Sequence, residues 1–414
     1  MGVRHAFLDL TPLRTSRPFR RLLIGQTFSG FGGQLAVVAV MFQVWQLTES
    51  PVWTGAVGIA HAAPLLAFGL FAGNLIDRLD RRKFYLAAIT GQAVCSAVLA
   101  IQALAGNDQV LIVLAIVATQ AAFGAGAGPA ARTFIPHLLP PQQAAAGLAL
   151  NRISFQGTML IGPALGGLVI GWWGVGACYL VDAVSFGCAF IGAFGLPAMR
   201  ATGDVPRPGL SGIVDGLAFI VRSPLVRGAL ATDLAATLFS MPLSLFPLIN
   251  AERFGNDPRT LGLFLTAIAV GGVGASAFSG TFTRLPRPGV VMLVGSAGWG
   301  VALALFGLSS QPWLGLVFLA VAGAADTMTV VSRSTIIQLS TPDALRGRVF
   351  AAEQIVGVAG PDLGNVRGGV VAGATSGLVA LVSGGVLCVL AVLAVAVSTP
   401  GLRKFVTERE SART

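Results

Sequence analysis

Charged residues are scarce in this chain. They make up 11% of its 414 residues, whereas a soluble domain carries about 25%. A water-soluble protein of this length could not cover its surface with so few charges. Hydrophobic residues reach 54%, and the mean hydropathy is +0.79. The shortage excludes an ordinary cytosolic enzyme, a disordered protein and a coiled coil, and it favours a polytopic membrane protein.

Lysine is almost absent, which excludes one energy source. The only lysines are Lys83 and Lys404, and neither follows a glycine. A Walker A loop requires Gly-Lys-Ser or Gly-Lys-Thr to hold the phosphates of a nucleotide. ATP-driven transport by this chain alone is therefore excluded, and the energy for transport must come from an ion or substrate gradient.

Histidine and cysteine are too few and too dispersed to form a metal centre or a disulfide framework. The cysteines all lie inside apolar stretches, where they are typical of small packing residues. No nucleophile constellation is present either. We therefore expect no resident metal, no cofactor and no enzymatic activity. The histidines and cysteines of the chain are His5, His61, His137, Cys95, Cys178, Cys188 and Cys388.

Long apolar segments recur along the chain. A helix needs about 20 mostly apolar residues to cross a hydrocarbon core of about 30 Å, and the alternating runs of about 10 residues that build membrane barrels are absent. The sequence therefore predicts an all-α polytopic membrane protein with twelve transmembrane helices. The candidate spans are 20–47, 52–76, 83–105, 110–134, 142–173, 175–196, 226–250, 261–282, 289–309, 312–339, 346–375 and 377–398.

Basic residues gather in the segments that twelve alternating spans would place on one side. By the positive-inside rule this side is the cytoplasm, so both termini are expected there. The basic start also leads into a span too long for a cleavable signal peptide. The distribution explains the net charge of +10 without a nucleic-acid partner. Arg132 and Arg333 are interpreted as residues at the cytoplasmic ends of their helices.

Residues 197–224 separate two sets of six spans. Within them, residues 210–222 are too short and too charged to span, and predict an amphipathic helix at the cytoplasmic membrane surface. We therefore expect an N-terminal half of residues 1–196 and a C-terminal half of residues 225–414, joined by this linker.

The two halves resemble each other. Arg132-Thr133-Phe134-Ile135 is echoed by Arg333-Ser334-Thr335-Ile336 in the corresponding span of the second half. Internal repeats of this kind are typical of secondary transporters, which bind substrate near the membrane midplane between the halves.

The loop between the second and third spans carries a motif. Gly73-Asn74-Leu75-Ile76-Asp77-Arg78-Leu79-Asp80-Arg81-Arg82-Lys83 resembles the signature loop of the major facilitator superfamily, with Asp80 in place of the second glycine. The resemblance implies the twelve-helix fold of that superfamily and a cytoplasmic gate. The alternative is a basic loop that only sets topology. The expected gate residues are Gly73, Asp77, Arg78, Arg81, Arg82 and Arg348.

Two further features of the first half bear on the resemblance. Gly162-Pro163-Ala164-Leu165-Gly166-Gly167 resembles part of the superfamily's antiporter motif, and its residues Gly162, Pro163, Gly166 and Gly167 are expected to allow close helix packing and a bend. Gln120 stands in the fourth span where many proton-coupled members have arginine, so the usual proton relay is not expected there.

Most of the chain resembles bacterial siderophore exporters of the enterobactin-exporter type. The segments that carry this resemblance are 72–83, 223–226, 287–293 and 338–348. It implies a monomer in the bacterial inner membrane that exports a siderophore from the cytoplasm by proton antiport. Multidrug and macrolide exporters share several of these features and remain the alternative. A membrane sensor without transport is a third possibility.

Ionisable residues inside spans are the candidates for coupling, because each costs about 2.5–3.5 kcal/mol on insertion scales. Glu353 leads as the proton-coupling carboxylate, followed by Asp326 and Asp233. Arg152 is expected either to pair with Glu353 or to attract an anionic substrate. The alternatives are that Glu353 and Arg152 form only a structural pair, and that Asp326 pairs with Arg333 two turns along one helix.

Uncharged polar residues complete the set of substrate-binding candidates. Gln26 and Gln34 lie eight residues apart on one face of the first span and could donate hydrogen bonds to a polar substrate. His61 lies within the second span. For all three residues, packing and hydrogen bonding within the bundle is the alternative role.

Overall fold

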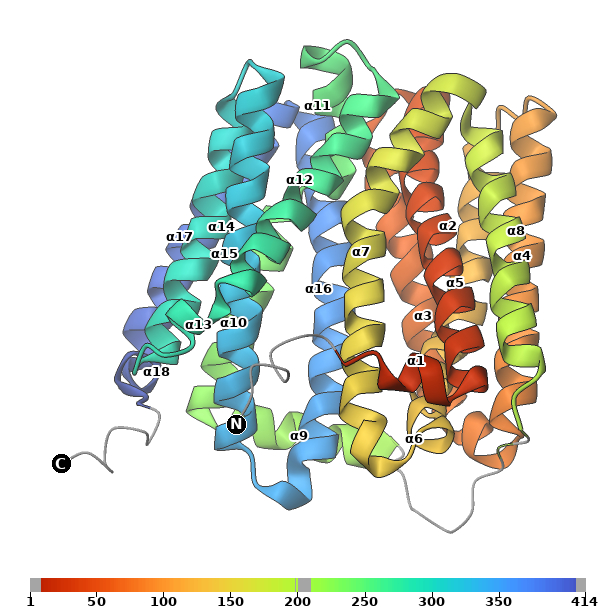
Figure 1. Ribbon diagram of the computed structural model, residues 1–414. Helices are drawn as coiled ribbons and strands as arrows, with labels where there is room; N and C mark the ends of the chain where they lie inside the picture. The colour runs from red at the N-terminus through yellow and green to blue at the C-terminus, as the bar shows by residue number, and fades with distance from the viewer. Residues whose placement is uncertain (1–8, 198, 200–209, 407–414) are drawn as a thin grey trace. The chain divides into compact units, whose positions relative to one another are not determined.

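The computed structural model describes residues 9–197, 199 and 210–406 (Figure 1). Every regular element among these residues is helical, as the sequence predicts. The chain divides into two compact units. The first unit combines Met1–Gln43 with Ala63–Val205, and the second combines Val44–Ala62 with Pro206–Thr414.

The first unit is built around α4, which packs against α5 and α8, while α7 packs against α8 and α1. Tyr85 and Phe134 meet edge to face in its core, with ring centroids 5.3 Å apart. The first unit takes in these helices, of which α2 and α3 also contribute to the second: α1 (Thr11–Thr15), α2 (Arg17–Thr48), α3 (Pro51–Arg78), α4 (Arg81–Leu104), α5 (Val110–Arg132), α6 (Phe134–Leu138), α7 (Pro141–Trp173) and α8 (Val175–Phe194).

The second unit centres on α10, which packs against α14, α15, α16 and α17, while α12 packs against α15. Its elements are α9 (Leu210–Arg222), α10 (Pro224–Ser240), η2 (Leu243–Leu245), α11 (Phe246–Arg253), α12 (Pro258–Ala277), α13 (Ser279–Phe282), α14 (Pro288–Leu308), α15 (Pro312–Ser340), η3 (Asp343–Leu345), α16 (Arg346–Ala374), α17 (Gly377–Ser398) and α18 (Pro400–Lys404). The predicted amphipathic helix is α9.

Proline sets the start of many of these helices. Its fixed φ angle suits the first turn, and its missing N–H would have no partner there. Gly174 separates α7 from α8 with a φ angle of +79°, a conformation that side chains other than glycine rarely adopt. Helices with proline in the first turn include those that begin at Pro141, Pro224, Pro258, Pro288 and Pro312.

The seventh predicted span is broken rather than continuous. α10 ends at Ser240, and Met241 is extended because it precedes Pro242. The break is satisfied by hydrogen bonds, as the interior of a membrane protein requires. Trp299 Nε1 donates to the Ser240 carbonyl at 3.2 Å, and Asn365 Oδ1 accepts from the Ser244 amide at 3.1 Å.

Eleven helical segments of the described residues are long and apolar enough to cross a membrane, with Pro224–Arg253 counted as one. The remaining predicted span, α16, has 29 residues, and is about 44 Å long at 1.5 Å per residue. It is not among the eleven. The charged residues in α16 are Arg346, Arg348, Glu353, Asp362 and Arg367. The fold is thus a polytopic helical membrane protein, and α16 would complete the predicted twelve spans.

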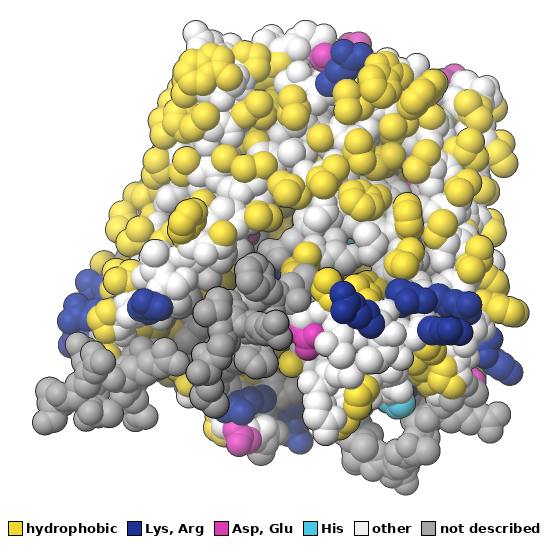
Figure 2. Space-filling view, in the orientation of Figure 1, with side chains coloured by type: hydrophobic (Ala, Val, Ile, Leu, Met, Phe, Trp, Pro, Cys, Tyr) yellow, Lys and Arg dark blue, Asp and Glu magenta, His cyan; other side chains and the backbone are white. Residues whose placement is uncertain are grey.

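Hydrophobic side chains cover the flanks of the helices in the view of Figure 2. Leu104, Ile191 and Val397 are each more than 70% exposed. So much exposed apolar surface is typical of a face that contacts lipid. In the first unit, basic side chains gather at the end where α1 and α6 lie; in the second, they gather around α18.

Candidate functional site

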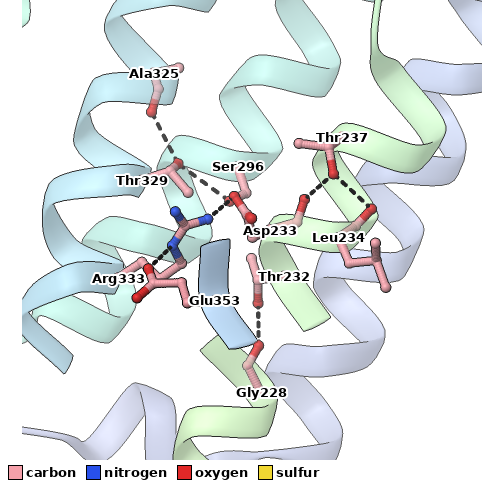
Figure 3. Close-up of polar contacts among 10 residues, drawn as sticks. All are labelled: Gly228, Thr232, Asp233, Leu234, Thr237, Ser296, Ala325, Thr329, Arg333 and Glu353. Carbon is pink, nitrogen blue, oxygen red and sulfur yellow. Dashed lines mark hydrogen bonds and ion pairs between the residues drawn. The ribbon is translucent and has the colours of Figure 1, made fainter. Parts of the chain in front are cut away.

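Three helices of the second unit bring charged side chains together. Arg333 of α15 forms an ion pair with Asp233 of α10, and its Nε lies 3.3 Å from Glu353 Oε1 of α16. The three side chains are about nine-tenths buried. Figure 3 shows the guanidinium between the two carboxylates. We call Asp233, Arg333 and Glu353 the charged triad.

Hydroxyl groups around the charged triad bond mainly to their own helices. Thr237 Oγ1 donates to the Asp233 carbonyl at 2.9 Å, and Thr329 Oγ1 donates to the Ala325 carbonyl at 3.0 Å (Figure 3). Ser296 lies 3.3 Å from Thr329 through their hydroxyls. Because these hydroxyls are used locally, the triad's charges are compensated chiefly by one another.

Asp326 adds a third carboxylate to this region. It lies two turns before Arg333 on α15 and interacts electrostatically with both Asp233 and Arg333. Its side chain is exposed although it lies near the middle of a spanning helix. A carboxylate facing lipid at that depth is costly, so a polar pathway is the better surrounding for it. All three predicted proton-coupling residues therefore lie near one guanidinium.

Arg333 lies within the last two turns of α15 and is a buried member of the charged triad, with only 8% of its surface exposed. Its interpretation as a basic residue at the cytoplasmic end of a helix did not indicate this burial. Arg333 also supplies the partner of Glu353, the role that had been considered for Arg152. The spacing of Asp326 and Arg333 on α15 hinted at a polar face, but no local signal identified Asp233 as the partner on another helix.

The substrate-binding candidates of the first unit lie on α2 and α7. Arg152 is exposed on α7, and its neighbour Asn151 donates to Gln26 Oε1 on α2 at 3.2 Å. Gln34, half-buried on α2, packs against Gly162 of α7. Gln26 therefore belongs to a polar contact one residue away from Arg152, whereas Gln34 belongs to a packed helix contact.

The glycine motif lies where α7 packs against α2. Gly162, Pro163, Gly166 and Gly167 are all buried. A Cβ atom on Gly162 would lie 2.5 Å from Gln34 Cβ, and one on Gly166 would lie 3.2 Å from the backbone of α2. Only glycine lets the two helices approach this closely.

His61 and its acidic partner Asp362 both belong to the second unit. Nδ1 of His61 lies 3.1 Å from Asp362 Oδ2, so the α3 residue pairs with α16. About half of the His61 side chain is exposed. The structure therefore offers hydrogen bonding as one role for a residue predicted to bind substrate.

The gate motif is described from Leu79 onward, and the side chains of Gly73, Asp77 and Arg78 lie outside the described residues. Asp80 caps α4 by accepting from the Arg82 amide at 2.9 Å. Burial alone would raise the pKa of Asp80, but hydrogen bonds from the amides of Met199, Arg82 and Lys83 outweigh it. Together with the charge of Lys83 they hold the pKa below its ordinary value.

The arginines of the motif fasten this end of α4 to the end of α8. The Arg82 side chain donates to the Phe194 carbonyl, and its guanidinium lies over the Phe194 ring at 5.5 Å from the centroid. The amide of Arg81 donates to the Met199 carbonyl at 3.1 Å. The described part of the motif thus stabilises one unit internally.

Arg348, the remaining gate candidate, belongs to the second unit. Its Nη1 lies 2.9 Å from Asp215 Oδ2 of α9. The α9 backbone touches α16 here, because a Cβ atom on Gly216 would overlap the Arg348 carbonyl. The linker helix is therefore anchored to the helix that carries Glu353. Sequence reasoning did not identify Asp215.

Sequence reasoning also missed a polar cluster in the first unit. Gln120 Nε2 of α5 donates to Ser96 Oγ of α4 at 2.8 Å, and Ser96 Oγ donates to Asp182 Oδ2 of α8 at 2.6 Å. We call Ser96, Gln120 and Asp182 the neutral-donor cluster. Two sequence signals pointed here: the glutamine that stands where many family members have arginine, and an acidic residue within the predicted span 175–196. Among the described residues, no group of three His, Cys, Asp or Glu side chains could hold a metal ion.

Comparison with known proteins agrees with this architecture. The sequence profile described as transmembrane secretion effector matches residues 8–412. The multidrug efflux pump Tap of Mycolicibacterium fortuitum is 29% identical over 401 residues, which cover 94% of this chain and 97% of the pump. The enterobactin exporter EntS of Shigella boydii is 26% identical over 361 residues, which cover 86% of each chain.

Solved structures support the fold. A POT family transporter in complex with 5-aminolevulinic acid superposes with a TM-score of 0.75 at 11% identity, covering 94% of this chain and 97% of its own. The nucleoside transporter NupG gives a TM-score of 0.72 at 13% identity, covering 94% and 99%. Because the family profile covers almost the whole chain and the relatives are exporters, the chain belongs to the transmembrane secretion effector family of the major facilitator superfamily and is a membrane efflux transporter.

Proposed function

We propose that this transporter exports a siderophore from the cytoplasm in exchange for protons, by alternating access between its two halves. The observation that carries the coupling part is the charged triad with Asp326 beside it. Three carboxylates share one guanidinium there. If all four groups were ionised, the three carboxylates and one guanidinium would carry a net charge of −2, and two of these carboxylates are about nine-tenths buried.

Proton uptake relieves that imbalance. An uncompensated charge is expensive inside a protein, and a carboxylate avoids the cost by binding a proton. Glu353 is the preferred carrier, because it is the most accessible of the three triad side chains and contacts Arg333 at the longer distance. Protonation of Glu353 would leave Arg333 paired with Asp233. The proton state of one residue can thus alter how α15, α16 and α10 are held together.

The substrate assignment rests on charge and on the relatives. Arg152 exposes a cation on α7, next to the polar contact between Asn151 and Gln26. A catecholate or carboxylate siderophore would find a charge-assisted hydrogen bond there. The enterobactin exporter is one of the relatives. We infer that Arg152 helps to bind an anionic substrate.

A multidrug or macrolide efflux antiporter is the second candidate. It is favoured by the similarity to the pump Tap, which covers more of the chain than that to the enterobactin exporter. In this case a lipophilic cation would approach Asp326 rather than Arg152.

Coupling is tested in proteoliposomes with an imposed pH gradient. Glu353→Gln mimics a permanently protonated side chain. We expect it to lose uphill, gradient-driven transport and to keep downhill exchange of substrate for substrate. Asp343→Asn, on an exposed residue paired with Arg346, is the matched control. Unchanged gradient-driven transport in Glu353→Gln would reject Glu353 as the proton carrier.

The substrate is tested in cells. A strain that lacks this gene is compared with its parent for siderophore in the medium and in the cytoplasm. We expect siderophore to accumulate in the cytoplasm of the deletion strain. Equal secretion by the two strains, together with increased drug sensitivity of the deletion strain, would favour the multidrug alternative.

A further inference from the structure

Asp182 is a deeply buried carboxyl group that the charged triad does not use. It lies on α8 with 1% of its surface exposed, in the first unit. Its surroundings come from three other helices, through Gly32 of α2, Ser96 of α4 and Gln120 of α5. Its place within four packed helices keeps it away from both lipid and bulk water.

The two oxygens of Asp182 have different environments. Oδ2 accepts from Ser96 Oγ at 2.6 Å and lies 3.5 Å from Gln120 Nε2. Oδ1 has no hydrogen-bond partner among the described residues. It faces the backbone of α2, because a Cβ atom on Gly32 would lie 2.8 Å from it and would overlap Ser185 Oγ. Oδ1 is therefore a buried polar atom covered by a glycine.

No cation compensates Asp182 within the described residues. The titratable groups that face it are Cys178 and Tyr179 of the same helix, and neither can carry positive charge. Its hydrogen-bond donors, a hydroxyl and an amide, are neutral. At this depth an ionised carboxylate would lose most of the free energy that water gives to its charge. The protonated acid carries no charge and avoids this loss. The arrangement therefore fits the protonated acid.

We propose that Asp182 is a second proton-binding site of the transporter, which holds its proton while α2 covers Oδ1 and releases it to water when α2 separates from α8. The step moves one proton between Oδ1 and water and makes or breaks no other covalent bond. Ser96 and Gln120 stay in place to stabilise the anion once water enters. This inference rests on proton-driven export, and it adds a proton carrier in the unit that lacks the charged triad.

A structural role would also bury Asp182, so the test must follow the proton itself. Infrared difference spectra at neutral pH report the carbonyl band of a protonated carboxylic acid. We expect this band in wild type labelled with ¹³C-aspartate, shifted by the label, and its loss in Asp182→Asn. Absence of any label-sensitive carboxylic acid band in wild type would overturn the proposal without requiring a variant to fold.

Proton stoichiometry provides the second readout. Purified Asp182→Asn in proteoliposomes is expected to move fewer protons per substrate than wild type, while exchange of substrate for substrate continues. Asn keeps the size of the side chain and can still hydrogen-bond to Ser96. An unchanged stoichiometry would assign Asp182 a structural role.

Replacing sodium by choline in all buffers is the control for metal cations. If transport and its stoichiometry depended on sodium, Asp182 would belong to a sodium site and the proton assignment would be rejected.

Failure of this inference is separable from failure of the proposed function. If Glu353→Gln abolishes gradient-driven transport and Asp182→Asn leaves the stoichiometry intact, export is proton-driven and only the second site is wrong. If wild type shows no dependence on a proton gradient, both are wrong.

Gly32→Ala gives a third check, because it places a methyl group against Oδ1 of Asp182. It should slow transport more than Gly33→Ala, since a Cβ atom on Gly33 would meet no atom within 4 Å.

Discussion

Arg333 and Asp233 form a buried ion pair between two helices, α15 and α10, that are far apart in the sequence. Each side chain is about one-tenth exposed. With Glu353 on α16, the pair links three helices of one unit through a single guanidinium. The stability of this unit therefore depends on Arg333. From the sequence alone, Arg333 was interpreted only as a basic residue that marks the cytoplasmic end of its helix.

Replacing Arg333 is expected to destabilise the protein strongly. Arg333→Ala leaves two buried carboxylates without their cation, and breaking a buried pair in this way costs about 3–5 kcal/mol. Arg333→Lys keeps the charge but loses the planar guanidinium, so its effect should be intermediate. The apparent midpoint of thermal unfolding in detergent measures both.

A surface ion pair provides the control for Arg333. Arg346 lies 2.9 Å from Asp343, and both side chains are more than half exposed. Arg346→Ala should cost about 0–1 kcal/mol, as exposed pairs do. Equal unfolding midpoints for Arg333→Ala and Arg346→Ala would contradict a buried role for Arg333.

Two glycines of α16 should respond in opposite directions to the same change. A Cβ atom on Gly364 would overlap the Thr237 carbonyl on α10, whereas one on Gly357 would meet nothing within 4 Å. Gly364→Ala should cost about 1–3 kcal/mol, as overpacking does. Gly357→Ala should stabilise α16 by about 0.5–1 kcal/mol. Unfolding midpoints that shift the same way would show that α10 and α16 are less tightly packed.

The Asp80 cap predicts a dependence on pH. Asp80→Ala should cost about 1 kcal/mol, and Asp80→Gly only a few tenths, because glycine is tolerated at a helix start. The pKa of Asp80 is lowered in the folded protein. Its stabilisation is therefore present above the pKa of the unfolded chain and is lost as the pH falls through the folded pKa.

Unfolding midpoints across the acidic range test the Asp80 prediction. Wild type and Asp80→Ala should differ at neutral pH and converge in acid. A difference that persists below the folded pKa of Asp80 would mean that the carboxylate charge is not what stabilises α4.

Arg152 should discriminate between substrate classes. Arg152→Ala removes a charge-assisted hydrogen bond, which contributes about 1.5–3 kcal/mol, or roughly a tenfold or greater increase in KM for an anionic siderophore. Arg152→Lys should recover part of this loss. Transport of a lipophilic cation should be unaffected or improved. The result that contradicts this prediction is an unchanged KM for the siderophore in Arg152→Ala.

Most of the helices were predictable from hydropathy, because a run of apolar residues indicates a span wherever its neighbours lie. The predicted segment 312–339 and the observed Pro312–Ser340 differ by one residue. The break before Pro242 was missed although its local cause, a proline that holds the preceding residue extended, is visible in the sequence. The hydrogen bonds that satisfy the break depend on tertiary contacts and are not visible there. Trp299 donates a hydrogen bond to the carbonyl of Ser240, and Asn365 accepts one from the amide of Ser244, at the two ends of the break.

The candidate site was predictable in its members but not in its pairings. Glu353, Asp326 and Asp233 stood out because charge is rare in spans, and they lie together. Arg333 was missed as a member because a basic residue near a helix end also fits the positive-inside rule. Asp182 also lies within a predicted span, and only the packing of four helices reveals that it is enclosed.

The charges of α16 have a consequence for biosynthesis. Each charged residue near the centre of a segment adds about 2.5–3.5 kcal/mol to its insertion at the translocon, so α16 is a poor membrane segment on its own. Its partners are synthesised first, since Asp233 and Arg333 belong to the earlier helices α10 and α15. We expect α16 to leave the translocon only once Arg333 can receive Glu353. The pairing that serves coupling in the finished transporter would then also retain its least apolar helix in the bilayer.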